Sequence, residues 1–326
     1  MSALPSIALT LALAPVGPSA GLPLDLRGPA AAPQPIIGGD PVALDVWTSV
    51  VAVIGISDGI GAYDTVYLCS GVLLDSQTVL TAAHCFKDAA DFTQILVVFG
   101  DSIYTHDENR RTTAVGWATH PDYCEKCTSD AHDFGFAILA DPPSGVPFVP
   151  PLVTQEEWDE VMVAGHDVTV VGFGATKDPD TNSVMGLGMD EIGLKNQVTM
   201  PLRSVSHNGL EFVAGAEGKD SCNGDSGGPA FAQLADGSWR LIGITSRGVS
   251  PCGTGKGIYG AAIAALPWIF AATGVDLLPE GCDDGSCVDT APKESGGCRI
   301  DAGAPGPAAA GLGLFGLAWV RRRRRR

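Results

Sequence analysis

Basic residues are scarce in this sequence. It has 20 Lys and Arg against 37 Asp and Glu, and six of the basic residues form the terminal run 321–326. The rest of the chain therefore holds 14 basic residues against all 37 acids. Nucleic-acid partners require clustered positive charge that neutralises phosphates. The composition therefore excludes nucleic acid as an expected partner.

Long helical patterns are also missing, because no 3.6-residue apolar period occurs before residues 261–275. Short runs rich in Val, Ile, Leu, Tyr and Thr alternate instead with clusters of Gly, Asp, Pro and Ser. With 45% hydrophobic residues the chain can bury a sizeable core. We expect an all-β domain with one late helix. The β-type runs include TVYLCSGVLL, QILVVFG, DVTVVGFG and RLIGITSRG.

The nine cysteines do not form an even set. Eight of them lie in pairs along the chain, which is typical of disulfides formed in an oxidising compartment. Cys298 has no such neighbour. The pairs are Cys69 with Cys85, Cys124 with Cys127, Cys222 with Cys252 and Cys282 with Cys287.

Positive charge is absent ahead of the N-terminal apolar stretch 7–16, although small residues follow it as at a signal peptidase site. We expect residues 1–20 to be a signal peptide, either an atypical one or part of a chain that starts upstream of Met1. Residues 21–35 are rich in Pro and Ala without a periodic apolar face. They predict an extended pro-segment.

One serine stands in a context that favours catalysis. Ser226 lies between Asp225 and Gly227 in GKDSCNGDSGGPA. A serine hydroxyl is a weak nucleophile at neutral pH, so it requires a base and a third group that orients the base. His84 at the end of LTAAHC and Asp133 at the start of an apolar run are the candidates.

Five motifs in chain order resemble the trypsin and chymotrypsin family of serine endopeptidases. The resemblance implies two antiparallel six-stranded β-barrels with a C-terminal helix, and a protease domain over residues 36–277. The site would lie in the cleft between the barrels. The motifs are IIGG at 36–39, LTAAHC at 80–85, HDFGFAIL at 132–139, GKDSCNGDSGGP at 218–229 and GKGIYG at 255–260.

Carried over residue by residue, the resemblance implies a catalytic triad. His84 would be the general base, Asp133 would orient it, and Ser226 would be the nucleophile. The backbone N–H groups of Gly224 and Ser226 would form the oxyanion hole. No cofactor or metal is implied, and Cys69–Cys85 and Cys222–Cys252 match family disulfides.

The resemblance also assigns a specificity pocket. Asp220 matches the base of that pocket, where a buried carboxylate selects Lys or Arg in the substrate. Gly248 and Gly257 match the pocket walls, where missing side chains leave room for a long cationic stem. Arg247 stands where the family usually has an aromatic residue, so specificity at neighbouring subsites, including a preference for acidic side chains, stays open.

Asp225 matches the residue that pairs with a new N-terminal amine after cleavage, which here would belong to Ile36. Such a zymogen requires an activating protease, but Pro35 excludes a tryptic cut at this bond. A protease that cuts after Pro35 is one solution. Removal of dipeptides from residue 28 onward, each ending in Pro or Ala, is another.

The C-terminus predicts sorting. Residues 278–297 are rich in Gly, Asp, Cys, Pro and Ser and predict a linker. In 298–326, Cys298 precedes an uncharged stretch and the arginine run, which resembles C-terminal sorting tails of myxobacterial surface proteins. A sorting peptidase would cut near Cys298 and leave the protein secreted or at the bacterial surface or outer membrane. Rhomboid-type sorting and a permanent membrane anchor are the alternatives.

Two alternatives from other classes stay open. One is a non-catalytic or permanently zymogenic binding module on the same fold. The other is a metal-binding surface protein in which Cys124, Cys127, His120 and His132 hold zinc. We favour a local disulfide for the two cysteines and a monomeric endopeptidase that acts on polypeptides.

Overall fold

The computed structural model describes residues 36–57, 65–87, 92–105, 107–177, 191–282 and 287–290. The predicted signal peptide, the pro-segment and the tail that begins at Cys298 lie outside these residues. Among the residues described, no helix is long and apolar enough to cross a membrane.

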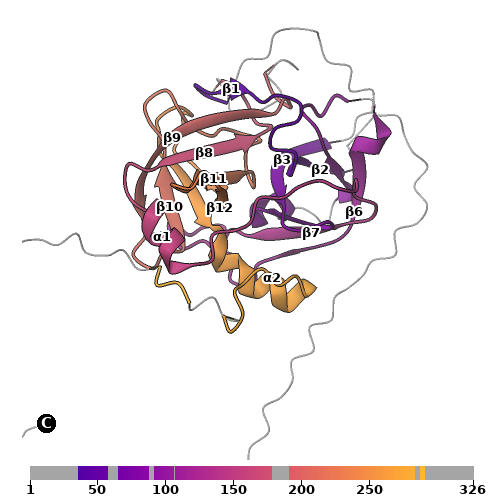
Figure 1. The fold of residues 1–326 in the computed structure, drawn as a ribbon. Coiled ribbons are helices and arrows are strands. Elements are labelled where there is room, and N and C mark those ends of the chain that lie inside the picture. The colour runs from indigo at the N-terminus through magenta and orange to yellow at the C-terminus, as the bar shows by residue number, and fades with distance from the viewer. Residues whose placement is uncertain are drawn as a thin grey trace, which may run out of the picture. The chain divides into compact units, whose positions relative to one another are not determined.

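The first barrel is closed by six antiparallel strands in the order β2-β3-β4-β7-β6-β5. Figure 1 labels four of them, β2, β3, β6 and β7. Strand β2 pairs with both β3 and β5, which closes the ring. Seven of the eight residues in β2 are buried, because both neighbours and the second barrel cover this strand. The strands are β2 (Val50–Ser57), β3 (Thr65–Leu73), β4 (Thr78–Thr81), β5 (Phe92–Val98), β6 (Arg111–Thr119) and β7 (Gly135–Leu139).

The second barrel follows from residue 167 onward. Its strands run in the order β9-β10-β13-β12-β11-β8, and the pairing of β9 with β8 closes the ring. A short strand β1 (Asp40–Pro41) adds to β9 from outside. The predicted pair of six-stranded barrels is therefore confirmed. The strands are β8 (Asp167–Gly172), β9 (Asn196–Val205), β10 (Glu211–Ala214), β11 (Pro229–Gln233), β12 (Trp239–Arg247) and β13 (Gly257–Ala261).

Helices are short. Helix α1 (Gln155–Val161) begins at a capping box, in which Thr154 and Glu157 bond each other's backbone N–H. The predicted late helix is a 3-10 turn η5 (Ala262–Ala265) followed by α2 (Leu266–Thr273), which ends at Gly274 in the left-handed conformation. The described residues also contain the 3-10 turns η1 (Ala83–Phe86) and η3 (Glu108–Arg110).

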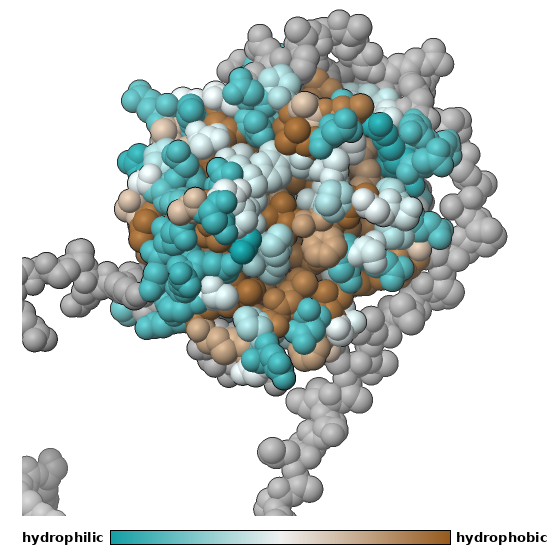
Figure 2. Space-filling view, in the orientation of Figure 1, coloured by the Kyte–Doolittle hydropathy of each residue, from teal (hydrophilic) through white to brown (hydrophobic). Residues whose placement is uncertain are grey.

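A shared core joins the barrels. One cluster of buried side chains contains Val50 and Ala52 of the first barrel, Phe231 and Ile244 of the second, and Ile269 of α2. Its apolar contacts fix the relative position of the two strand systems, on which any site between them depends. Figure 2 shows hydrophobic residues gathered on the lower part of the viewed face, where Figure 1 draws α2.

The packed part of the chain extends past α2. Val288 is 5% exposed and belongs to the core of the second barrel. Asp289 and Gln155 of α1 bond each other through backbone and side chain, with the Asp289 N–H donating to Gln155 Oε1 at 2.6 Å. Part of the predicted linker thus packs against the second barrel and α1.

Candidate active site

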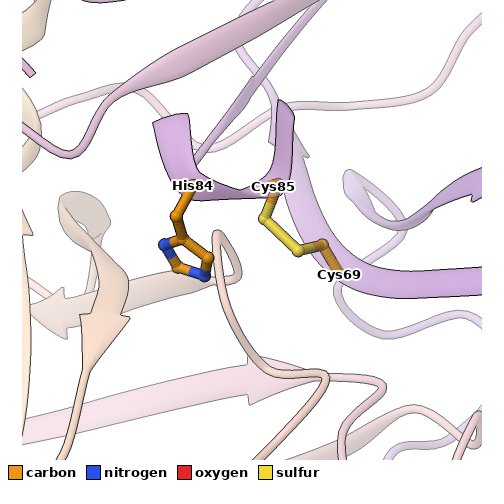
Figure 3. Close-up of side chains that lie close together, drawn as sticks. All are labelled: Cys69, His84 and Cys85. Carbon is orange, nitrogen blue, oxygen red and sulfur yellow. A yellow bond between two sulfur atoms is a disulfide. The ribbon is translucent and has the colours of Figure 1, made fainter. Parts of the chain in front are cut away.

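His84 lies in the 3-10 turn η1, directly after β4. Buried Ala83 and Phe86 anchor this turn, and a disulfide of 2.05 Å joins its Cys85 to Cys69 on β3. Figure 3 shows the imidazole beside that disulfide. Ligand atoms of these three residues lie within 4.8 Å of one another, but both sulfurs are bonded to each other. They offer no thiolates, so the group does not fit zinc.

Strand pairing brings Asp133 to His84. Thr81, the last residue of β4, lies opposite Gly135, the first residue of β7. The residues just beyond these two strand ends therefore meet. Asp133 Oδ2 lies 2.8 Å from His84 Nδ1, and Asp133 Oδ1 accepts the His84 backbone N–H at 2.9 Å.

The Asp133 carboxylate is 5% exposed and accepts a further hydrogen bond at 2.6 Å from the Ser246 hydroxyl. Burial alone would raise the pKa of Asp133, but hydrogen bonds from His84 and Ser246 outweigh it and hold this pKa below its ordinary value. The carboxylate therefore stays ionised at neutral pH and holds the imidazole in one orientation.

Ser226 lies in a tight turn before β11 that rests on both barrels. Its carbonyl accepts the Ser70 N–H of β3 at 2.8 Å, and the next residue, Gly227, donates to Thr245 O at 2.7 Å. Gly227 has φ +77°, and a Cβ there would lie 2.0 Å from Thr81 Oγ1. Glycine is thus required for the turn to approach β4.

Gly224, the predicted oxyanion-hole residue, precedes Ser226 in the same turn and has φ +96°. Its carbonyl is fixed by the Ser70 hydroxyl, which donates at 2.9 Å. The turn is also tied to the facing loop by the Cys222–Cys252 disulfide.

Both Ser226 and Asp220 line a pocket of about 310 Å³. Asp220 is 1% exposed; its Oδ2 accepts the Gly255 N–H at 3.0 Å, whereas its Oδ1 has no hydrogen-bond partner among the described residues. Burial raises the pKa of this carboxyl above its ordinary value. Gly248 lines the pocket, and a Cβ there would meet no atom within 4 Å. A Cβ at Gly257 would lie 3.0 Å from Asp220 Oδ1.

Asp225 is fully buried. Its oxygens accept the N–H groups of Gly174 at 2.8 Å and Cys222 at 2.9 Å. Burial raises its pKa to about 7, and no cation among the described residues opposes this. Ile36 is also fully buried, and the carbonyl of its neighbour Ile37 accepts the Asp220 N–H at 3.2 Å. The segment after Pro35 therefore already packs against the pocket.

All four predicted disulfides are present. Cys124 and Cys127 are bonded to each other, so they are not free to ligate zinc, and the rings of His120 and His132 stack at 5.1 Å. The structure thus has the local disulfide that we favoured over a metal site.

Two interactions of charged side chains were not predicted. Arg247 forms an ion pair with Glu211 of β10. Lys195 is 2% exposed, donates to Trp47 O at 3.0 Å, and has a pKa that burial lowers to about 7. Neither partner is recognisable from sequence, because each pairing joins distant segments.

The chain resembles known serine proteases in sequence. The trypsin family model matches residues 36–269. The chain is 29% identical over 232 residues to the CLIP domain-containing serine protease B15 of Anopheles gambiae, covering 64% of this chain and 62% of that protein. It is 29% identical over 259 residues to tryptase of Mus musculus, covering 74% of this chain and 90% of that protein. It is 32% identical over 211 residues to kallikrein-8 of Homo sapiens, covering 62% and 75%. The chain spans only about three-fifths of the length of several relatives that it matches.

Proposed function

The chain belongs to the trypsin family, and from this membership we propose that the protein is a serine endopeptidase acting through Ser226, His84 and Asp133. The hydrogen bond of 2.8 Å between His84 and the buried Asp133 carries the proposal. It supplies an oriented base, and Ser226, the proposed nucleophile, lines a pocket together with Asp220.

In the proposed reaction the Ser226 hydroxyl attacks the substrate carbonyl carbon while His84 removes its proton. Asp133 stabilises the imidazolium that forms, and backbone N–H groups of Gly224 and Ser226 donate to the oxyanion. His84 then protonates the leaving amine, which gives an acyl-enzyme at Ser226. Water, deprotonated by His84, hydrolyses this ester and restores the serine.

The pocket supports cleavage after Arg or Lys. A buried carboxylate oxygen without a partner is costly, and a substrate cation would supply the missing donor at Asp220 Oδ1. The open space at Gly248 leaves room for its aliphatic stem.

The same architecture supports a zymogen. Cleavage before Ile36 would create an α-amine, and Asp225 is a buried carboxylate that lacks a cation among the described residues. We include in the proposal an activating protease for the Pro35–Ile36 bond, export through residues 1–20, and sorting at Cys298 to the exterior or surface of a bacterium.

The test uses the full chain with a site-specific protease sequence inserted so that Ile36 becomes the first residue. We expect kcat/KM for a peptide amide ending in Arg to exceed that for the matched Phe amide by more than about 10²-fold, and Ser226→Ala to abolish both. Activity without Arg preference would overturn only the pocket assignment. A folded protein without activity would favour the non-catalytic binding module.

A further inference from the structure

An ion pair beside the specificity pocket joins two segments that the reaction depends on. The Arg247 guanidinium of β12 donates to both oxygens of Glu211 on β10, each at 2.8 Å. This fork-shaped geometry is the strongest form of such a pair. The Glu211 side chain is only 8% exposed and that of Arg247 is 26% exposed, so solvent screens the pair weakly.

Both partners also hold the loop that leads to Asp133. Glu211 accepts the backbone N–H groups of Asp130 and Ala131 at 3.1 Å each. Arg247 donates to the Thr128 carbonyl at 2.9 Å. All these contacts between the ion pair and the loop therefore involve residues no more than five positions before Asp133 in the sequence.

The loop requires such support because its backbone is strained. Asp130 has φ +54° and His132 has φ +45°, a region that side chains other than glycine rarely adopt. Strain of this kind persists only when surrounding contacts fix it. His132 immediately precedes Asp133, so relaxation here would move the carboxylate that orients His84.

A second connection reaches Asp133 through the side chain of Ser246. Arg247 Nη1 donates to Ser246 Oγ at 3.2 Å, and Ser246 Oγ donates to Asp133 Oδ2 at 2.6 Å. A guanidinium can only donate hydrogen bonds, so the Ser246 hydroxyl accepts from Arg247. The proton of the Ser246 hydroxyl is therefore directed at Asp133. The chain of bonds then ends at His84 Nδ1.

We propose that Arg247 and Glu211 are positioning residues for the catalytic triad, which together hold the Asp133 loop and the Ser246 hydroxyl in the geometry that orients His84. The proposal rests on the proposed endopeptidase function. It assigns Arg247 to the enzyme's own framework rather than to acidic substrate side chains.

Because Arg247 and Glu211 carry opposite charges, the intact pair adds no net charge near the triad. Removing Arg247 leaves Glu211 negative, which favours the protonated, inactive imidazole, whereas Glu211→Gln leaves Arg247 positive and disfavours it. The other charged or titratable groups around this pair are Asp133, Asp130, Tyr123 and, near Tyr123, Glu125. All of them stay the same in both variants.

The experiment compares variants of the full chain with Ile36 freed as described above. Arg247→Ala and Glu211→Gln remove one partner each, and Arg247→Lys keeps the charge without the fork. The matched control is Arg240→Ala, because Arg240 is on the same strand and pairs with Glu157 at 2.6 Å, with side chains 20% and 14% exposed. Folding is checked by urea unfolding of each variant.

For Arg247→Ala we expect kcat to fall about tenfold or more through misplacement of the triad, with partial rescue in Arg247→Lys. KM should change much less. The acidic limb of kcat/KM should move up in Arg247→Ala and down in Glu211→Gln, because the charge left near the triad has the opposite sign in the two variants. Arg240→Ala should match the parent. Equal kinetics and pH profiles for Arg247→Ala and Arg240→Ala would overturn the proposal.

A second readout does not require turnover. The downfield proton resonance of the His84 Nδ1–H bonded to Asp133 should be shifted or broadened in Arg247→Ala and unchanged in Arg240→Ala. If the parent shows no turnover, the endopeptidase function fails, and this resonance still decides whether the pair positions the triad. An unchanged resonance in Arg247→Ala would refute it.

Discussion

The fully buried carboxylate of Asp225 should make the uncut chain less stable as pH rises. Its pKa is raised from 3.8 to about 7, so between these values the folded chain keeps a proton that the unfolded chain has released. The free energy of unfolding therefore falls with rising pH. At about 1.36 kcal/mol per pKa unit, a shift of roughly three units costs about 4 kcal/mol once the pH exceeds 7.

The assay is urea unfolding of the uncut chain at about pH 4 and pH 8, in a Ser226→Ala background that prevents autolysis. Other groups also titrate in this range, so the measured quantity is the difference between the parent and Asp225→Asn. The parent should lose about 4 kcal/mol more than the Asn variant. Freeing the Ile36 amine should remove most of this difference, because the amine then pairs with the carboxylate. Parallel pH dependence of both uncut proteins would refute the reasoning.

Three further predictions concern single side chains. Ser246→Ala removes a hydrogen bond to the Asp133 carboxylate and should lower kcat/KM about tenfold to a hundredfold, measured with the Arg amide; an unchanged value would show that this bond is dispensable. Asp220→Asn should lower kcat/KM for Arg substrates by at least about 10²-fold and leave the Phe amide nearly unaffected, whereas an equal loss on both would point to misfolding. Lys195→Met should raise the melting temperature by several degrees at pH 6 and by less at pH 9. Burial lowers the pKa of Lys195 from 10.5 to about 7, so the folded chain loses stability as pH falls from about 10.5 to about 7; a pH-independent effect would contradict this.

Local signals in the sequence were sufficient to predict an all-β domain with one late helix. Short β-type runs between turn residues predict strands, and the motifs around His84 and Ser226 place them in family order. The disulfides were also predictable, since each joins two cysteines that follow one another in the sequence. The closure of the barrels was implied only by the resemblance, because strand pairings such as β9 with β8 are not visible in composition.

Contacts between distant segments that no motif marks could not be predicted. Glu211 lies 36 residues before Arg247, and a glutamate on a strand carries no signal of its buried partner. The sequence shows that Arg247 replaces the aromatic residue usual in the family. It does not indicate which acid pairs with the arginine. Val288 likewise lies in a Gly- and Asp-rich stretch that predicts a linker, yet it belongs to the core of the second barrel. Burial of this kind depends on the tertiary structure.

The central claim is that Ser226 is a nucleophile activated by His84. The most direct measurement treats the protein with Ile36 freed with a serine-directed phosphonate that carries an Arg-like side chain, and then locates the adduct by peptide mass spectrometry. We expect one adduct per chain, on Ser226, formed at a rate that falls by orders of magnitude in His84→Ala. A folded protein that forms no adduct, or forms it on another residue, would contradict the account.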